Sequence, residues 1–185
     1  MSAGPPFPVL RTDRLVLRQL TVGDSRDWFR SLSDVVVTEL IGMDPLETVE
    51  EIGETIDRYT AGFEEGAMMA WAITLRESSQ FIGTCSYEHI NSEDHSGVIG
   101  YDLLREHWGQ GFMTEALRAI IDYGFKKLGL NLIQANTDPT NTPSRNLLKR
   151  LGFLEEGTFR ESAYFTGEFG DDRLYSLTRS QWHES

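Results

Sequence analysis

Residues 96–137 constrain the fold more than any other stretch, because they run from strand to helix to strand. Residues 96–104 and 132–137 have the composition of strands. Between them, apolar residues recur with a period near 3.6, which predicts a helix over residues 113–128. A strand, a helix and a strand in succession form a crossover, and a crossover leaves its two strands parallel. We therefore expect at least one parallel strand pair.

The other patterns add antiparallel strands and further helices around this crossover. Residues 69–75 and 81–89 look like strands and are joined to residues 96–104 by short polar turns, which predicts an antiparallel meander. The remaining predictions are strands at 14–18, 153–165 and 173–178, a polar turn at 167–172, and helices at about 25–32, 46–65 and 142–151. This order predicts an α/β (α+β) fold, a mixed sheet with helices on both faces, in one domain of residues 1–185 with a flexible arm at 1–9.

The loop that enters the central helix contains two glycines, Gly109 and Gly111. The first N–H groups of a helix have no partner within it, and with the helix dipole they form an anion site. This loop and residues 136–144 both follow strands of the predicted parallel pair, where open α/β sheets bind ligands. We therefore predict that residues 108–114 hold the diphosphate of a nucleotide-like cofactor. The alternative is that the two glycines only mark a turn.

Composition narrows the class of partner. The net charge is −12, and no cluster of Lys and Arg is long enough for a nucleic-acid or membrane-surface partner. The acidity suits a cationic substrate such as an amine, but the favoured interpretation is that it only keeps the protein soluble. Cys85 is the only cysteine, so we expect no disulfide, and no Cys/His grouping has zinc spacing, so we expect no metal. Without a long apolar run or a signal-peptide pattern, we expect a cytoplasmic protein.

Three segments resemble the GCN5-related N-acetyltransferases (GNAT), and most closely their RimJ/RimL-type branch, which acetylates ribosomal-protein N-termini. They are RTDRLVLR at residues 11–18, WGQGFMTEAL at 108–117 and NTPSRNLLKRLGF at 141–153. The resemblance covers about residues 10–180. It implies a GNAT fold, with a central mixed, mostly antiparallel sheet whose two parallel strands splay apart to hold acetyl-CoA. The anion at the Gly-rich loop would then be the diphosphate of coenzyme A.

The resemblance also implies which residues hold acetyl-CoA. Splayed strands leave backbone groups unpaired, and the amides of the pantetheine arm would pair with them at Leu103, Leu104 and Asn136. The loop departs from the broader family pattern at Trp108 and Met113, but a cradle of amides depends more on backbone than on side chains. The cofactor-binding residues implied are Leu103, Leu104, Trp108, Gly109, Gln110, Gly111, Phe112, Met113, Thr114, Asn136, Asn141 and Ser144.

A second departure concerns catalysis. Many relatives have a tyrosine as general acid where this chain has Leu148, which cannot donate a proton. The resemblance then points to Ser144, whose hydroxyl would hydrogen-bond the thioester sulfur or protonate the leaving thiolate. The alternative is that Ser144 only serves the first turn of its helix. Asn141 resembles a cofactor-contacting asparagine of the family and could also be an N-cap.

The implied reaction is direct attack of an amine on the thioester in a ternary complex. A backbone amide near Leu103 or Leu104 would stabilise the oxyanion. The amine must lose a proton, and Glu88 is preferred as the general base over His89 and Glu161. Alternation along the strand puts Glu88 and His89 on opposite faces, so at most one of them faces the site. The alternative for Glu88 is a surface carboxylate.

The acceptor is the most open prediction. The favoured reading is a protein N-terminal amine of the ribosomal-protein Ser/Ala type, bound near Trp28, Phe29 and Met43 and the last hairpin. The alternatives are a small-molecule amine (an amino acid, a polyamine or an antibiotic) and a non-catalytic acyl-CoA-binding domain. A P-loop protein is excluded because no Gly-Lys-Ser/Thr sequence is present. The sequence leaves homodimer formation open.

Overall fold

The computed structural model describes residues 6–165 and 168–182, without the side chains of 163–168, and its strands form one eight-stranded sheet. In the order of the sheet, the strands are β1 (Leu10–Arg11), β2 (Leu15–Gln19), β3 (Met69–Leu75), β4 (Phe81–Asn91), β5 (Ser96–Leu103), β6 (Leu132–Thr137), β8 (Glu168–Thr178) and β7 (Leu154–Phe165). The helices are α1 (Ser25–Leu32), α2 (Val35–Ile41), α3 (Glu50–Glu64), α4 (Phe112–Lys126) and α5 (Thr142–Arg150), with 3-10 turns at Val22–Asp24 and Arg105–His107.

The pairing of the strands confirms both the meander and the crossover. Strands β3, β4 and β5 pair antiparallel in succession, while β5 and β6 pair parallel across α4. The last three strands pair antiparallel, in the order β6, β8, β7. The sheet is therefore mixed and mostly antiparallel, as predicted.

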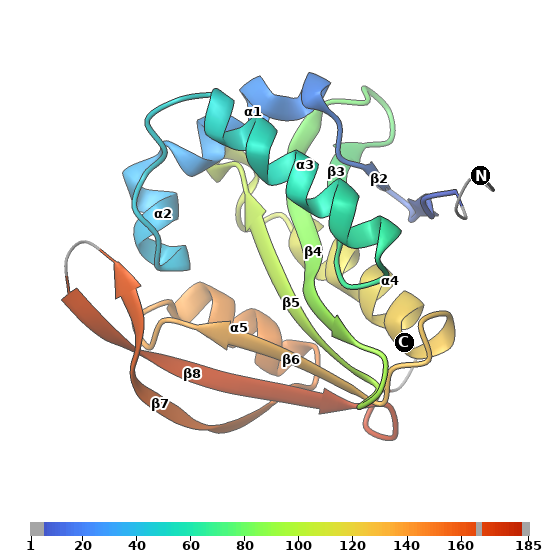
Figure 1. The fold of residues 1–185 in the computed structure, drawn as a ribbon, viewed down its shortest axis with the longest axis vertical. Coiled ribbons are helices and arrows are strands. Elements are labelled where there is room, and N and C mark those ends of the chain that lie inside the picture. The colour runs from blue at the N-terminus through green and yellow to red at the C-terminus, as the bar shows by residue number, and fades with distance from the viewer. Residues whose placement is uncertain (1–5, 166–167, 183–185) are drawn as a thin grey trace.

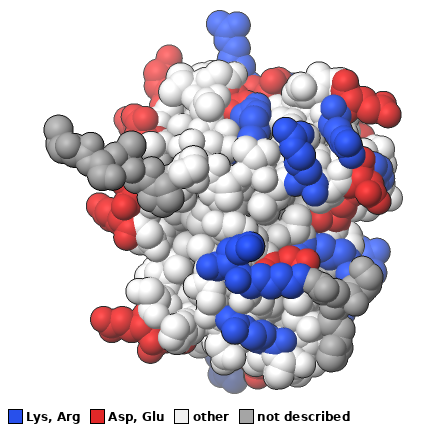
Figure 2. Space-filling view, turned by 90° about the vertical axis from the view of Figure 1, so that its right-hand side faces the viewer, with Lys and Arg blue, Asp and Glu red and all other residues white. Residues whose placement is uncertain are grey.

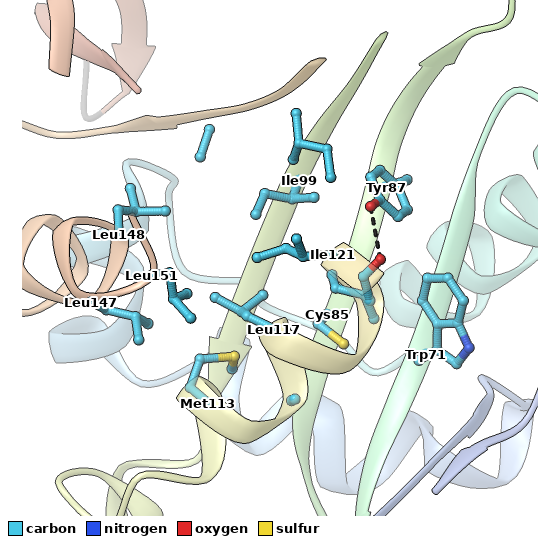
Figure 3. Packing of buried hydrophobic residues seen from close by; sticks show 14 of the residues in the cluster. Trp71, Cys85, Tyr87, Ile99, Met113, Leu117, Ile121, Leu147, Leu148 and Leu151 are labelled. Carbon is cyan, nitrogen blue, oxygen red and sulfur yellow. Dashed lines mark hydrogen bonds between the residues drawn. The ribbon is translucent and has the colours of Figure 1, made fainter. Parts of the chain in front are cut away.

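Helices cover both faces of the sheet because its strands alternate (Figure 1). On β3, Ala70 and Ala72 belong to one core cluster with α1 and α3, whereas Trp71 and Ile73 belong to a second cluster with α4. Figure 3 shows this second cluster, in which Leu147 and Leu148 of α5 lie with Met113 and Leu117 of α4. Cys85 is fully buried in this cluster as a free cysteine.

The parallel pair is short, and this shapes the site. The pairing of β5 with β6 covers only three residues of each strand and ends at Val98 and Gln134. Beyond these residues the two strands diverge, as Figure 1 shows. Strand β5 stays paired with β4, and β6 stays paired with β8, so only the edges that face each other are released. This divergence is the predicted splay.

Four element predictions need correction. Helix α2 was missed because its Val-Val-Val-Thr run disfavours a helix. The helix forms because the Asp34 side chain caps its start and Gly42, in the left-handed conformation, caps its end. The predicted turn at 167–172 is wrong from residue 168 onward, since β8 already begins at Glu168, and residue 167 lies outside the described part. Helix α3 begins at Glu50, after the expected position, and the short β1 was not predicted.

Candidate functional site

A cavity of about 980 Å³ lies between the divergent strands, the start of α4 and the start of α5. Nine of the predicted cofactor residues line it: Leu103, Trp108, Gly109, Gly111, Phe112, Met113, Thr114, Asn141 and Ser144. Gln110 and Leu104 do not line it, and Asn136 lines a neighbouring cavity instead. The unpredicted helix α2 contributes Val37, Leu40 and Ile41 to the wall. We call this space the first cavity.

The Gly-rich loop has the backbone of a close-approach turn. Gly109 and Gly111 adopt φ of +72° and +80°, a region that side chains disfavour. Gly111 is the N-cap of α4 and provides no side-chain cap, so no side chain of this residue competes for the first N–H groups of the helix. The donors and the helix dipole there can meet an anion.

An arginine from the N-terminal motif fixes this loop from outside the cavity. Arg14 Nη1 donates to the carbonyl of Gln110 at 3.0 Å, and its Nε pairs with Glu115 Oε2 at 2.7 Å. The guanidinium also lies 4.4 Å from the centre of the Phe112 ring. Arg14 therefore contacts the loop at Gln110 and the first turn of α4 at Phe112 and Glu115, although it is far from both in the sequence.

Backbone groups at the end of β5 already have partners. The Leu103 carbonyl accepts a hydrogen bond from Trp108 Nε1 at 2.7 Å, and the Leu104 N–H donates to Ile82 O at 2.9 Å. Trp108 therefore ties the loop to the end of β5. Since the Leu104 N–H is occupied, it is a poor candidate for the oxyanion donor that the sequence suggested.

A second cavity, of about 390 Å³, adjoins the first one. Both are lined by Leu40, Ile41, Tyr101, Asp102 and Ser144, so the cavities meet at these five residues. Of the predicted acceptor residues, Trp28 and Met43 line the second cavity, whereas Phe29 packs in the core cluster beneath α1 and α3.

Glu88 lies in the second cavity, whereas His89 and Glu161 line neither cavity. The pairing of β4 with β5 shifts register between Tyr87 and His89, and Gly100 of β5 has no side chain to occupy the space of the Glu88 carboxylate. Solvent reaches Glu88 through the cavity, yet the surrounding protein raises the pKa of its carboxyl through desolvation, against a smaller opposing effect of Arg58. A carboxylate with a raised pKa is a better proton acceptor near neutral pH.

Asp102 is a buried carboxylate between the two cavities that sequence reasoning missed. Its oxygens accept hydrogen bonds from Trp28 Nε1 at 3.0 Å, from Ser31 Oγ at 2.7 Å and from the Thr84 hydroxyl. Burial raises the pKa of Asp102, although these donors oppose the shift. With its oxygens engaged by α1 and β4, Asp102 anchors the wall between them.

Ser144 and Asn141 are fixed by neighbours on both sides of the cleft. Asn141 caps α5 by accepting the Ser144 N–H at 3.0 Å, and its Nδ2 donates to Leu40 O at 2.6 Å. Ser144 Oγ lies 2.8 Å from Tyr101 Oη. The sequence did not single out Tyr101, because only the assembled sheet shows that it lies beyond the parallel pairing. Leu148 is fully buried in the core (Figure 3).

Three further findings concern the surface charge, metal-binding groups and the hydropathy of the helices. On the face shown in Figure 2, Lys and Arg side chains gather mainly in the right half of the view with some Asp and Glu among them, and Asp and Glu lie along the left edge of a broad uncharged area. Within residues 6–165 and 168–182, no group of three or more His, Cys, Asp or Glu side chains has the arrangement of a metal site. No helix in the described part of the chain is long and apolar enough to cross a membrane.

Comparison with known proteins gives consistent matches. The family model described as an acetyltransferase (GNAT) domain matches residues 14–154. Uncharacterized N-acetyltransferase YoaA of Bacillus subtilis (strain 168) is 34% identical, over 94% of this chain and 98% of its own. The [ribosomal protein uS5]-alanine N-acetyltransferase of Escherichia coli (strain K12) is 28% identical, over 94% and 92%. Mycobacterium smegmatis RimJ, solved with CoA-disulfide, superposes with a TM-score of 0.85 at 25% identity, over 97% of this chain and 90% of RimJ.

Proposed function

Because the chain belongs to the GNAT acetyltransferase family, we propose that it moves the acetyl group of acetyl-CoA to the α-amine of a protein N-terminus, of the ribosomal-protein Ser/Ala type. The observation that carries the proposal is the pair of adjoining cavities, which meet at Tyr101, Asp102 and Ser144. Two cavities that meet at polar side chains can hold two substrates at once, which direct transfer in a ternary complex requires.

The first cavity suits coenzyme A in several respects. The Gly109–Gly111 loop and the start of α4 offer backbone donors to a diphosphate. The released edges of β5 and β6 offer backbone groups to the amides of a pantetheine arm. His107, whose buried Nε2 has no hydrogen-bond partner in the described structure, lines this cavity, and so do the cationic Lys149 and Arg150. These features together favour a long, anionic, amide-containing ligand.

The second cavity suits an amine. Glu88, Asp102, Asp138 and Asp172 line it, and among the described lining residues Arg58 is the one cation that opposes them. This excess of carboxylates attracts a cationic acceptor. We propose that Glu88 removes the proton that the bound amine must lose before attack, and that Ser144 donates a hydrogen bond to the thioester sulfur. We also propose that the chain works as a single domain, because elements from α1 to β8 line the two cavities together.

Binding and turnover test the proposal separately. Titration calorimetry of the folded chain with acetyl-CoA should give saturable binding, and the absence of binding at high micromolar ligand would contradict the site. A screen of ribosomal N-terminal peptides, amino acids, polyamines and aminoglycosides, with detection of the released thiol, should show the greatest kcat/KM for peptides that begin with Ser or Ala. If a small amine gave the greatest kcat/KM, the acceptor would be a small molecule and not a protein N-terminus. Binding without any turnover would indicate a non-catalytic acyl-CoA-binding domain.

Replacing Arg14 with alanine should weaken acetyl-CoA binding about tenfold, because the loop loses its contacts to Gln110, Phe112 and Glu115. Calorimetry measures the change. Arg11→Ala removes an exposed arginine from the same segment and is the matched control. Equal dissociation constants for the two variants would show that Arg14 does not order the loop.

A further inference from the structure

The proposed site lacks the phenol that the tyrosine position of α5 would provide. Leu148 occupies that position and is fully buried in the core cluster around α4. A different phenol reaches the junction of the two cavities from the opposite side of the cleft. Tyr101 on β5 places its Oη 2.8 Å from Ser144 Oγ on α5, and both residues line both cavities.

The splay of the sheet is what lets Tyr101 reach α5. The parallel pairing ends at Val98, so Tyr101 belongs to the part of β5 that has no partner on the β6 side. Its backbone is held by β4, where it lies opposite Cys85. The body of its ring packs against the core cluster, which leaves its hydroxyl at the first turn of α5. Asn141 holds the same turn through the Ser144 N–H.

We propose that Tyr101 is a positioning residue for acetyl transfer: its phenol donates a hydrogen bond to Ser144 Oγ and thereby directs the Ser144 hydroxyl at the sulfur of acetyl-CoA. The proposal rests on the function proposed above. A serine hydroxyl has one proton and can rotate. When Tyr101 supplies the donor to Ser144 Oγ, the Ser144 proton is free to point at a third atom, and the cleft between the two cavities is where the thioester would lie.

The transfer step then balances as follows. Glu88 first takes one proton from the bound ammonium group and passes it to solvent. The amine nitrogen then attacks the thioester carbon, the C–N bond forms and the excess proton on nitrogen passes to Glu88. The C–S bond breaks, and its electron pair remains on sulfur, which accepts the hydrogen bond of Ser144. The thiolate takes up a proton from solvent, and Glu88 returns its proton to solvent. The products are an N-acetylated amine and free coenzyme A.

Tyr101 acts as a hydrogen-bond donor and not as an acid that gives its proton to the thiolate, because its pKa is too high. Burial raises the pKa of Tyr101 to about 12, whereas a free thiol has a pKa of about 8.5. A phenol that is so much less acidic than the thiol retains its proton in the presence of the thiolate. Tyr101 and Ser144 therefore stabilise the charge that develops on sulfur through hydrogen bonds, as an oxyanion hole does for oxygen.

A double-mutant cycle tests the proposal, with kcat and KM measured for Tyr101→Phe, Ser144→Ala and the double variant. Tyr101→Phe should lower kcat about tenfold and Ser144→Ala about thirtyfold or more, since each removes one hydrogen bond that stabilises the transition state. The double variant should be no slower than Ser144→Ala alone, because Tyr101 acts only through Ser144. The Kd for acetyl-CoA and the acceptor KM should change by less than about threefold. Tyr123→Phe removes a phenol from the core, away from both cavities, and is the matched control.

Three results would overturn the proposal. An unchanged kcat in Tyr101→Phe would show that the phenol does not take part. A further tenfold loss on adding Tyr101→Phe to Ser144→Ala would show that Tyr101 acts independently of Ser144. A loss that appears in KM alone would assign the pair to binding. In each case the unchanged chain still turns over, so the proposed function survives; absence of turnover in the unchanged chain would overturn the function and this inference together. Thermal melts confirm that each variant is folded.

Discussion

Glu88→Gln is expected to lower kcat for acetyl transfer by a factor on the order of 10²–10³, within the usual range for the loss of a general base. Glutamine keeps the shape of the side chain but cannot take a proton from the amine. The Kd for acetyl-CoA should stay within about twofold, because Glu88 lines only the second cavity. Steady-state kinetics with saturating acetyl-CoA, together with calorimetry, measure both quantities.

The dependence of kcat on pH tests the same assignment of Glu88 as the general base. Desolvation by the surrounding protein raises the pKa of Glu88, and the base works only when it is deprotonated. The kcat of the unchanged chain should therefore rise with pH through a point above the ordinary glutamate pKa, and this rise should vanish in Glu88→Gln. His89→Gln changes the next residue, which is exposed and lines neither cavity, and should leave the profile intact. An equal loss of kcat in both variants would contradict the assignment.

Stability separates a catalytic role for Glu88 from a structural one. A carboxyl with a raised pKa in the folded state binds a proton that the unfolded chain has already released, so stability falls as pH rises through that window. Glutamine carries no charge at any pH and removes this dependence. Glu88→Gln should therefore melt no lower than the unchanged chain at neutral pH, although it is far less active. A marked fall in melting temperature would point to a structural carboxylate.

Gly100→Ala should reproduce part of the loss at Glu88 without removing the carboxylate. A Cβ on Gly100 would lie 2.1 Å from Glu88 Oε1, so the flexible glutamate must move away. We expect kcat to fall about tenfold while acetyl-CoA binding is retained, since a misplaced base is a poorer base. Combining the change with Glu88→Gln should give no further loss, and kinetics of the double variant test this. Additive losses would show that Gly100 acts by another route.

The sequence predicts those parts of the site that local patterns determine. The helical period of residues 113–128 and the strands on either side fix the parallel crossover. The crossover in turn places the Gly109–Gly111 loop and the Asn141–Ser144 turn at the same end of the sheet, where both line the first cavity. Strand alternation also predicted that at most one of Glu88 and His89 would face the site, and only Glu88 lines a cavity.

The rest of the site depends on packing between distant segments, which local patterns do not encode. Helix α2 closes both cavities although its valines disfavour a helix, because its ends are capped and Asn141 holds its last turn. The partners of Tyr101 and Arg14 lie 43 and at least 96 residues away in the chain. The length of the parallel pairing, which decides how far the sheet opens, is likewise a property of the assembled sheet.

The Gly109–Gly111 loop provides the prediction with the largest expected effect on acetyl-CoA binding. Gly111→Val should raise the Kd for acetyl-CoA about a hundredfold or more, equivalent to about 2.8 kcal/mol. Gly111 has a φ of +80°, which a β-branched residue strongly disfavours, so the backbone must rotate and turn the loop amides away from the ligand. A Cβ there would meet only Arg14 Nη2, at an ordinary 3.5 Å, so a clash within the protein is not the cause.

Gly129→Val is the matched control at the other end of the same helix. Gly129 has a φ of +74°, its Cβ would meet nothing within 4 Å, and it does not line the first cavity. Both variants therefore carry similar backbone strain, and each should lose about 1–2 kcal/mol of stability in a denaturant titration. Only Gly111→Val should weaken the binding of acetyl-CoA. If both variants bound acetyl-CoA equally well, the left-handed turn before α4 would serve only to begin the helix, and the diphosphate would have to be held elsewhere.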